Sequence, residues 1–472
     1  MWKFIRKLKP YTIGYGRLYI ASIIAVALAT LFAFAIPLVL RTTLDSLIGD
    51  ELVKSGITAK LVKYFGGKEN LAQKLWLPGL IMLFLTAFSG LFTYFKGKWS
   101  AIAAESIAKR MRDNLYNHIQ KLPFSYHQNV ETGDLIQRCT SDVETIRGFM
   151  AMQLVEVGRA LFMLALVIPI MLSLNVRLTL VSLAVVPFLF GFSMLFFKQV
   201  KKNFKYSDEA EGAMSAVLQE NLSGIRVVKA FHRQEFETEK FDIKNIDYRK
   251  KTFRLIELFA WYWSVSDLLA LFQIAAVIIF GALWATLGKI SIGTLVVFIT
   301  YVGNMLWPVR QMGRVLTDMG KSIVAMDRIE EIFAVEPERL RGEGKNPPKL
   351  NGEITFENVS FAYDENEAEI LSDISFKIAQ GETLAILGPT GAGKSTLVNL
   401  LPRLYDVTRG RILIDGIDIT TMNKEFLRQQ VSMVLQEPFL YSRSLKENVR
   451  MAFPNAEEEI LHEATRVASI HD

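Results

Sequence analysis

The stretch LGPTGAGKST, residues 387–396, carries three glycines within six positions, followed directly by a lysine and a serine. It matches the pattern G-x-x-x-x-G-K-[ST] at Gly388, Gly393, Lys394 and Ser395. The apolar run TLAIL precedes it and the helical pattern KSTLVNLLPRLY follows it, which is the strand–loop–helix order that a phosphate-binding loop needs. Glycines let successive backbone N–H groups converge on phosphate oxygens, and the helix N-terminus adds partial positive charge. The stretch therefore predicts a nucleotide site.

The predicted cofactors are ATP and Mg²⁺. Lys394 is expected to bind the β and γ phosphates, and the Ser395 hydroxyl is expected to hold Mg²⁺. An ordinary glycine-rich turn is the competing interpretation. The residues predicted to line the nucleotide are Gly388, Pro389, Thr390, Gly391, Ala392, Gly393, Lys394, Ser395 and Thr396.

The first three hundred residues are dominated by long apolar runs. The chain of 472 residues is 51% hydrophobic, with a mean hydropathy of +0.24. Because about 20 apolar residues cross the roughly 30 Å of bilayer hydrocarbon, runs of this length predict membrane spans. Six are expected, at about 18–40, 75–95, 155–174, 178–197, 268–287 and 291–307.

The connections between these spans alternate in length and in charge. The long ones, 96–158 and 198–267, contain 21 Lys and Arg, whereas the other three contain eight. Long connections rich in helix formers predict helices that continue beyond the bilayer. Their positive charge places them in the cytoplasm of a multi-pass protein of the cell (inner or plasma) membrane, with the nucleotide domain on the same side. The net charge of +6 is thus explained without a nucleic-acid partner.

A change in composition marks the domain boundary. Residues 1–335 are expected to form the membrane domain, 336–350 a linker rich in Pro, Gly and charge, and 351–472 the nucleotide domain. In the last range, the β-rich runs EITFENVSF, ETLAILG, GRILIDGIDI and VSMVL alternate with helical pieces. The expected fold class is an α-helical membrane domain of six transmembrane helices with long cytoplasmic extensions, followed by a partial α/β P-loop NTPase domain.

With these motifs in place, the chain resembles a half-transporter of the ATP-binding cassette (ABC) exporter family. The resemblance extends over essentially all 472 residues, through residues 110–146, 218–237, 356–401 and the run QEPFLYSRSLKENV at 436–449. It implies ATP-driven export of a small hydrophobic or amphipathic, lipid or peptide substrate across membrane lipid. It also implies a second half-transporter, identical or different, as partner.

The resemblance assigns two further residues and two contact regions. Tyr363 matches the aromatic residue that stacks on adenine, although a surface-packed tyrosine is the simpler alternative. Gln436 matches the glutamine that contacts Mg²⁺ and the surroundings of the attacking water. Residues 124–133 and 220–229 resemble the coupling elements that press on the nucleotide domains, with solvated basic helix faces as the alternative.

Three parts of a complete ATPase of this family are not found in the sequence: the signature loop, the Walker B carboxylates and the switch histidine. Asp415 ends the apolar run RILID, but Gly416 follows it, so an antiparallel hairpin is favoured over Walker B. His462 and His471 are expected on solvent-facing helix surface. The chain is therefore expected to stop before the signature motif. This leaves a second hypothesis open, a truncated membrane subunit that binds ATP without hydrolysing it.

Ionisable residues are rare in the predicted spans. Glu156, Arg159 and Asp267 are expected near the interfaces, which disfavours an ion-coupled transporter. Gln273 and Asn304 are expected either to line a central cavity or, more simply, to bond between helices.

Overall fold

The computed structural model describes residues 2–48, 75–338, 349–363, 368–436 and 439–471. These residues form two compact units. The membrane unit comprises residues 1–121 and 130–336, and the nucleotide unit comprises residues 122–129 and 337–472. The short segment 122–129 thus belongs to the nucleotide unit, although it lies inside the range expected for the membrane domain.

In the described residues, six helical segments are long and apolar enough to cross a membrane, which confirms the predicted number. The helices of these segments are α2 (Gly16–Ile48), α5 (Trp76–Ile119), α9 (Leu154–Leu174), α10 with α11 (Val176–Leu183 and Val186–Ser223), α13 (Gln234–Thr286) and α14 (Ile292–Ala334). A shorter helix, α1 (Trp2–Thr12), precedes them. Ahead of α9 the chain winds through α7 (Thr132–Gln137), a π-helix (Arg138–Asp142), α8 (Val143–Gly148) and a second π-helix (Phe149–Gln153).

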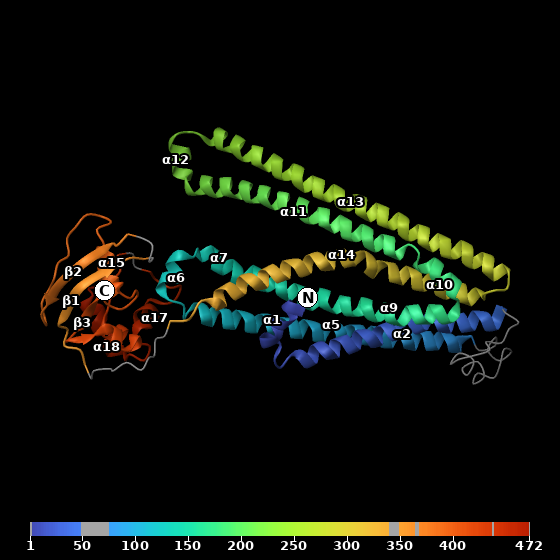
Figure 1. Ribbon diagram of the computed structural model, residues 1–472, viewed down its shortest axis with the longest axis horizontal. Coiled ribbons are helices and arrows are strands. Elements are labelled where there is room, and N and C mark those ends of the chain that lie inside the picture. The colour runs from blue at the N-terminus through green and yellow to red at the C-terminus, as the bar shows by residue number, and fades with distance from the viewer. Residues whose placement is uncertain (1, 49–74, 339–348, 364–367, 437–438, 472) are drawn as a thin grey trace. The chain divides into compact units, whose positions relative to one another are not determined.

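The predicted helical extensions are present. Helix α13 has 53 residues, which at 1.5 Å per residue gives about 80 Å, more than twice the thickness of the hydrocarbon layer. Helices α11 and α13 run side by side as an antiparallel pair, and α12 (Ile225–Ala230) lies at the turn between them (Figure 1). The long connections are therefore helices rather than loops.

Buried polar side chains tie the apolar helices together. Gln273 on α13 is fully buried, donates to the Val181 carbonyl oxygen at 2.8 Å and accepts from the Val185 N–H at 3.1 Å. It satisfies backbone groups where α10 breaks into α11, so the interhelical interpretation of this residue is confirmed. The Asp45 carboxylate of α2 accepts from the Gly293 N–H at 2.9 Å and holds the start of α14.

The nucleotide unit contains an antiparallel sheet with the strand order β2-β1-β3-β4. Its strands are β1 (Ile354–Phe361), β2 (Leu371–Ile378), β3 (Arg409–Ile414) and β4 (Ile417–Asp418). The described helices of this unit are α6 (Phe124–Asn129), α15 (Lys394–Leu400), α16 (Lys424–Gln430), α17 (Leu445–Val449) and α18 (Glu458–Val467), with short 3₁₀ turns at Ile419–Thr421 and Arg450–Ala452. A buried core that includes Phe356, Val359, Leu400 and Ile412 joins the sheet to α15 and α16.

Two of the expected strands do not form, and here the prediction is wrong. Residues 382–388 and 431–435 have no strand assignment, and most of their apolar side chains are exposed, with Leu387 93% and Val434 101% exposed. A strand needs a neighbour to take up its backbone hydrogen bonds. Among the described residues the four strands of the sheet pair only with one another, through antiparallel contacts, and leave these two segments without a partner.

Candidate nucleotide site

The glycine-rich loop of the nucleotide unit turns through backbone conformations that only glycine adopts easily. Gly391 and Gly393 have φ angles of +87° and +82°, in the left-handed region. A Cβ atom at Gly393 would also lie 2.8 Å from the end of the Leu371 side chain, which would have to shift to admit a larger residue. The loop therefore bends sharply just before α15 begins at Lys394.

This bend leaves hydrogen-bond donors available. Within the described residues, no hydrogen bond uses the backbone N–H groups of Gly391, Gly393, Lys394 or Ser395. The Lys394 ammonium folds back over the loop and donates to the carbonyl oxygens of Gly388 at 2.8 Å and Pro389 at 2.7 Å. Free N–H groups beside a lysine suit the oxygens of a polyphosphate, and the exposed Ser395 hydroxyl is a ligand type that Mg²⁺ accepts. The residues present therefore fit a nucleotide with its metal ion.

Tyr363 lies beside this loop. Its hydroxyl is within hydrogen-bond distance, 3.0 Å, of the Thr396 hydroxyl on α15. Tyr363 is 44% exposed, and its ring packs edge-on against Phe361 and Tyr405, at centroid distances of 5.0 and 5.2 Å. One ring surface held next to a phosphate loop can stack on a base, so the geometry is compatible with the predicted adenine contact.

Gln436 makes no direct contact with the phosphate loop among the described hydrogen bonds. In the part of the chain that the structure describes, no hydrogen bond joins Gln436 to Lys394 or Ser395, and its side chain is exposed. It follows the 431–435 segment that forms no strand. Its predicted role at Mg²⁺ remains a prediction.

Asp415 has a structural role that explains its position. Asp415 and Gly416 both have positive φ angles and form the turn between β3 and β4, which confirms the antiparallel hairpin. The Asp415 carboxylate accepts from the backbone N–H groups of Asn351, Gly352 and Glu353, at 2.5, 3.1 and 3.0 Å. Its oxygens fix the segment that enters β1 and are not arranged for a metal ion.

The two histidines beyond the loop lie on and after the last helix of the nucleotide unit. His462 on α18 and His471 are both exposed, as expected, and their rings pack against each other with centroids 5.2 Å apart. His471 lies beyond the end of α18 rather than on it, and its Nδ1 atom is 2.9 Å from the Thr465 hydroxyl.

The nucleotide unit includes residues 124–129 of the predicted coupling segment 124–133 of the first long connection, whereas residues 130–133 belong to the membrane unit. Phe124 of α6 packs edge-on against the Tyr405 ring at a centroid distance of 5.6 Å, and the Tyr405 hydroxyl donates to the Gln128 side chain. Burial, with a smaller contribution from Tyr363, raises the pKa of Tyr405 to about 12, so the phenol stays a protonated donor at neutral pH. Tyr405 thus touches both α6 and the proposed adenine-stacking residue Tyr363.

A second anchor holds the beginning of the nucleotide unit. The Glu338 carboxylate accepts from Arg428 at 2.8 and 2.9 Å and from Lys424 at 3.1 Å, both on α16. Burial alone raises the pKa of Glu338, but the hydrogen bonds and charges of these two cations outweigh it and lower the pKa overall.

Comparison with known proteins agrees with this arrangement. The profile of the ABC transporter transmembrane region matches residues 19–309, and the ABC transporter profile, which describes the nucleotide-binding domain, matches residues 371–472. The chain belongs to the ABC transporter family. Both parts of a half-transporter lie in this one polypeptide, and the ABC transporter domain makes it an ATP-binding member of an ATPase and translocase family.

Two of the relatives align with essentially the whole chain, and a third aligns with about three quarters of it. YgaD of Bacillus subtilis, whose name assigns it to multidrug export ATP-binding/permease proteins, is 32% identical over 100% of this chain and 79% of its own length. YknU of the same organism, named as an uncharacterized ABC transporter ATP-binding protein, is 30% identical over 99% of this chain and 77% of its own length. A Staphylococcus aureus protein with a name like that of YgaD is 32% identical over 77% of this chain and 63% of its own length.

Two residues of the nucleotide unit were missed by sequence reasoning about the site. Tyr405 lies at the end of the helical pattern after the phosphate loop, and no local signal shows that it meets Tyr363 and α6. Glu338 lies in the expected linker, where a charge normally indicates solvent. Only its partners on α16, about 90 residues later, reveal that it is an anchor.

Proposed function

We propose that the protein is one half of a dimeric ABC exporter that uses ATP to move a hydrophobic or amphipathic substrate across the cell membrane. The observation that carries this proposal is the phosphate loop with free backbone N–H groups next to Tyr363, in a chain that also supplies six membrane-spanning helices. A partner half-transporter, identical or different, completes the assembly. The names of YgaD and of the Staphylococcus aureus relative support export as the direction.

In this proposal each site residue has one task. The N–H groups of Gly391, Gly393, Lys394 and Ser395, together with the Lys394 ammonium, bind the phosphates. Tyr363 stacks on the adenine. Ser395 and Gln436 hold Mg²⁺, which neutralises charge on the phosphates when it is bound. The excess of Lys and Arg in the long connections favours a cytoplasmic position for both connections and for the nucleotide unit.

Replacement of the loop lysine tests the nucleotide site. In membranes containing the full chain, Lys394→Ala is expected to reduce photolabelling by an azido-ATP analogue at least tenfold, because a charge-assisted contact to phosphate is worth about 1.5–3 kcal/mol. Lys377→Ala is the matched control, since Lys377 is an exposed lysine of β2 paired with Glu353. Equal labelling of both variants would overturn the assignment of the phosphate loop.

Export is tested separately in sealed vesicles. ATP-dependent accumulation of a lipophilic fluorescent dye, present in the unmodified protein and lost in Lys394→Ala, is the expected result. ATP binding without hydrolysis or accumulation in the unmodified protein would favour the non-hydrolysing membrane subunit instead.

A further inference from the structure

The chain passes between its two units three times, after residues 121, 129 and 336. On the membrane side, these crossings begin or end at three places: the end of α5, the segment from residue 130 through α7, and the end of α14. The three places are distant in the sequence, yet the ends of α5 and α14 lie close to α7 (Figure 1). Through them the nucleotide unit is covalently attached to the membrane helices.

His118, in the last turn of α5, holds the end of α14. Its Nε2 atom lies 3.0 Å from the Ile332 carbonyl oxygen and 3.1 Å from the Val335 carbonyl oxygen. Because both partners are acceptors, Nε2 is the protonated nitrogen and donates to them. The last carbonyl groups of a helix have no partner within that helix, so His118 caps α14 from its neighbour. The His118 and Phe333 rings also pack with their centroids 5.0 Å apart.

Arg328 of α14 holds the segment that returns from the nucleotide unit. Its guanidinium group lies 2.5 Å from the Asp134 carboxylate of α7 and 3.2 Å from the Asp142 carboxylate of the π-helix that follows. Arg138, of the same π-helix, donates to the Arg328 carbonyl oxygen at 2.7 Å and to the Glu331 carboxylate at 2.9 Å. Both arginine side chains are mostly buried, so these contacts largely replace water around their charges.

The ionic contacts form one network rather than separate pairs. The Asp134 carboxylate accepts from both arginines, Arg328 at one oxygen and Arg138 at the other. Charge-assisted hydrogen bonds are roughly twice as strong as neutral ones, and the loss of one member of a partly buried network leaves the others without partners. The residues that join the three chain ends, here called the junction cluster, are His118, Asp134, Arg138, Asp142, Arg328 and Glu331.

We propose that the junction cluster makes the three chain ends one rigid base, so that a displacement of the nucleotide unit is passed to α14 and its neighbours instead of being absorbed at a flexible joint. Arg328 is the central positioning residue because it joins α14 both to α7 and to the π-helix. This inference rests on the proposed export function and deepens it, since it names the residues that transmit movement to the membrane helices.

The first test measures whether the three chain ends open together, and it needs no nucleotide. Hydrogen exchange is followed in the full chain in phosphatidylcholine nanodiscs, in peptides that cover residues 110–121, 130–142 and 325–336. Arg328→Gln is expected to speed up exchange about tenfold or more in all three, because loss of its charge-assisted contacts opens the whole base. Acceleration confined to 130–142 and 325–336, which Arg328 itself contacts, or no acceleration, overturns the proposal.

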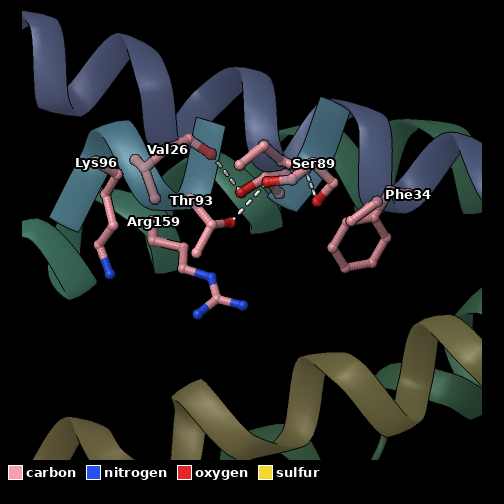
Figure 2. Close-up of a pocket in the computed structure, with 9 residues that line it drawn as sticks. Val26, Phe34, Ser89, Thr93, Lys96 and Arg159 are labelled. Atoms are coloured by element: carbon pink, nitrogen blue, oxygen red, sulfur yellow. Dashed lines mark hydrogen bonds between the residues drawn. The ribbon is translucent and has the colours of Figure 1, made fainter. Parts of the chain in front are cut away.

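Lys96→Gln is the matched control for this test. Lys96 of α5 pairs with Glu156 of α9 at 2.7 Å, and its side chain is 21% exposed, compared with 28% for Arg328. Figure 2 shows Lys96 beside a small cavity of about 90 Å³ lined by α2, α5 and α9. It lies about 33 Å from His118 along α5, at 1.5 Å per residue. Exchange at 130–142 and 325–336 should stay unchanged, and equal acceleration by both variants overturns the proposal.

The second test measures whether the rigid base is used in transport. In sealed vesicles Arg328→Gln is expected to keep azido-ATP labelling, which shows that the nucleotide unit is folded, but to lower ATP-dependent dye accumulation at least fivefold. Arg328→Lys keeps the charge and is expected to restore part of the accumulation. Accumulation by Arg328→Gln equal to that of the unmodified protein overturns the proposal.

The two proposals fail in different ways. Lys394→Ala is expected to lose both labelling and accumulation while exchange at the three chain ends stays as in the unmodified protein. If the unmodified protein accumulates no dye, the export proposal fails, and the exchange test still decides for or against the rigid base.

Discussion

The two units of this transporter differ in the contacts that stabilise each of them internally: those of the membrane unit are mostly short in sequence range, and those of the nucleotide unit are long. In the membrane unit each helix satisfies its own backbone, as in α14, whose 43 residues form one continuous helix. In the nucleotide unit the sheet depends on distant partners, since β1 pairs with β3 about 60 residues later and Asp415 fixes the residues before β1. The membrane unit is therefore sensitive where helices approach closely, and the nucleotide unit is sensitive at its long-range anchors.

The largest effect is expected where a glycine of α14 packs directly against the backbone of α2. A Cβ atom at Gly293 of α14 would lie 2.6 Å from the Arg41 carbonyl oxygen and 2.6 Å from an Asp45 carboxylate oxygen of α2. Because a backbone oxygen cannot move aside easily, Gly293→Ala is expected to destabilise the membrane unit by about 2–3 kcal/mol. All seven tryptophans of the chain precede residue 308, so thermal unfolding followed by tryptophan fluorescence in detergent reports this unit.

Gly303→Ala is the control for this substitution. Gly303 lies in the same helix with nothing within 4 Å of an added Cβ, so the variant is expected to be neutral or more stable by about 0.5–1 kcal/mol. Equal destabilisation by the two alanines would contradict close packing at Gly293 as the cause of the effect.

A smaller effect is expected at the long-range anchor of the sheet. Asp415→Ala removes the acceptor of three backbone N–H groups. Because the site is partly exposed, the free energy of unfolding of the nucleotide unit is expected to fall by only about 2 kcal/mol. Hydrogen exchange of the peptides that cover β1 and β3 in the full chain is expected to speed up roughly tenfold or more, because about 1.4 kcal/mol corresponds to a factor of ten.

Asp418→Ala provides the local counterpart. Asp418 bonds only two residues away, to the N–H and hydroxyl groups of Thr420, so the same peptides are expected to change less. If Asp418→Ala accelerated exchange as much as Asp415→Ala, the sequence distance between a carboxylate and its partners would not determine how strongly it stabilises the sheet.

The same difference between local and long-range contacts explains which features of the structure can be predicted from the sequence. The six spans and the phosphate loop depend on runs of about 20 residues and on one ten-residue motif, and both are predictable. The apolar runs at 382–388 and 431–435 have a local pattern as typical of a strand as that of β1. They nevertheless form no strand and are mostly exposed, because a strand also needs a neighbouring strand, which no local pattern shows. Likewise, the sequence shows that Glu156 and Arg159 lie near the third span. It does not show that Glu156 pairs with Lys96, 60 residues earlier.

The smallest expected effect concerns Glu338 and depends on pH. Glu338→Gln removes the ion pairs with Arg428 and Lys424 and is expected to destabilise the attachment of this segment to α16 by about 1 kcal/mol at pH 7. The pKa of Glu338 is lower in the folded protein than in an unfolded chain, where it is about 4.3. Its stabilisation is therefore complete above that value and is lost as the pH falls through the lower folded pKa.

Hydrogen exchange of α16, normalised to an unstructured peptide at each pH, measures this effect. Unmodified protein and Glu338→Gln should differ at pH 7 and converge as the pH falls through the lowered folded pKa of Glu338. Glu336→Gln, two residues earlier at an exposed side chain, is expected to match the unmodified protein throughout. A difference between Glu338→Gln and unmodified protein that persisted in acid would mean that packing of the side chain, rather than its charge, anchors the nucleotide unit at this point.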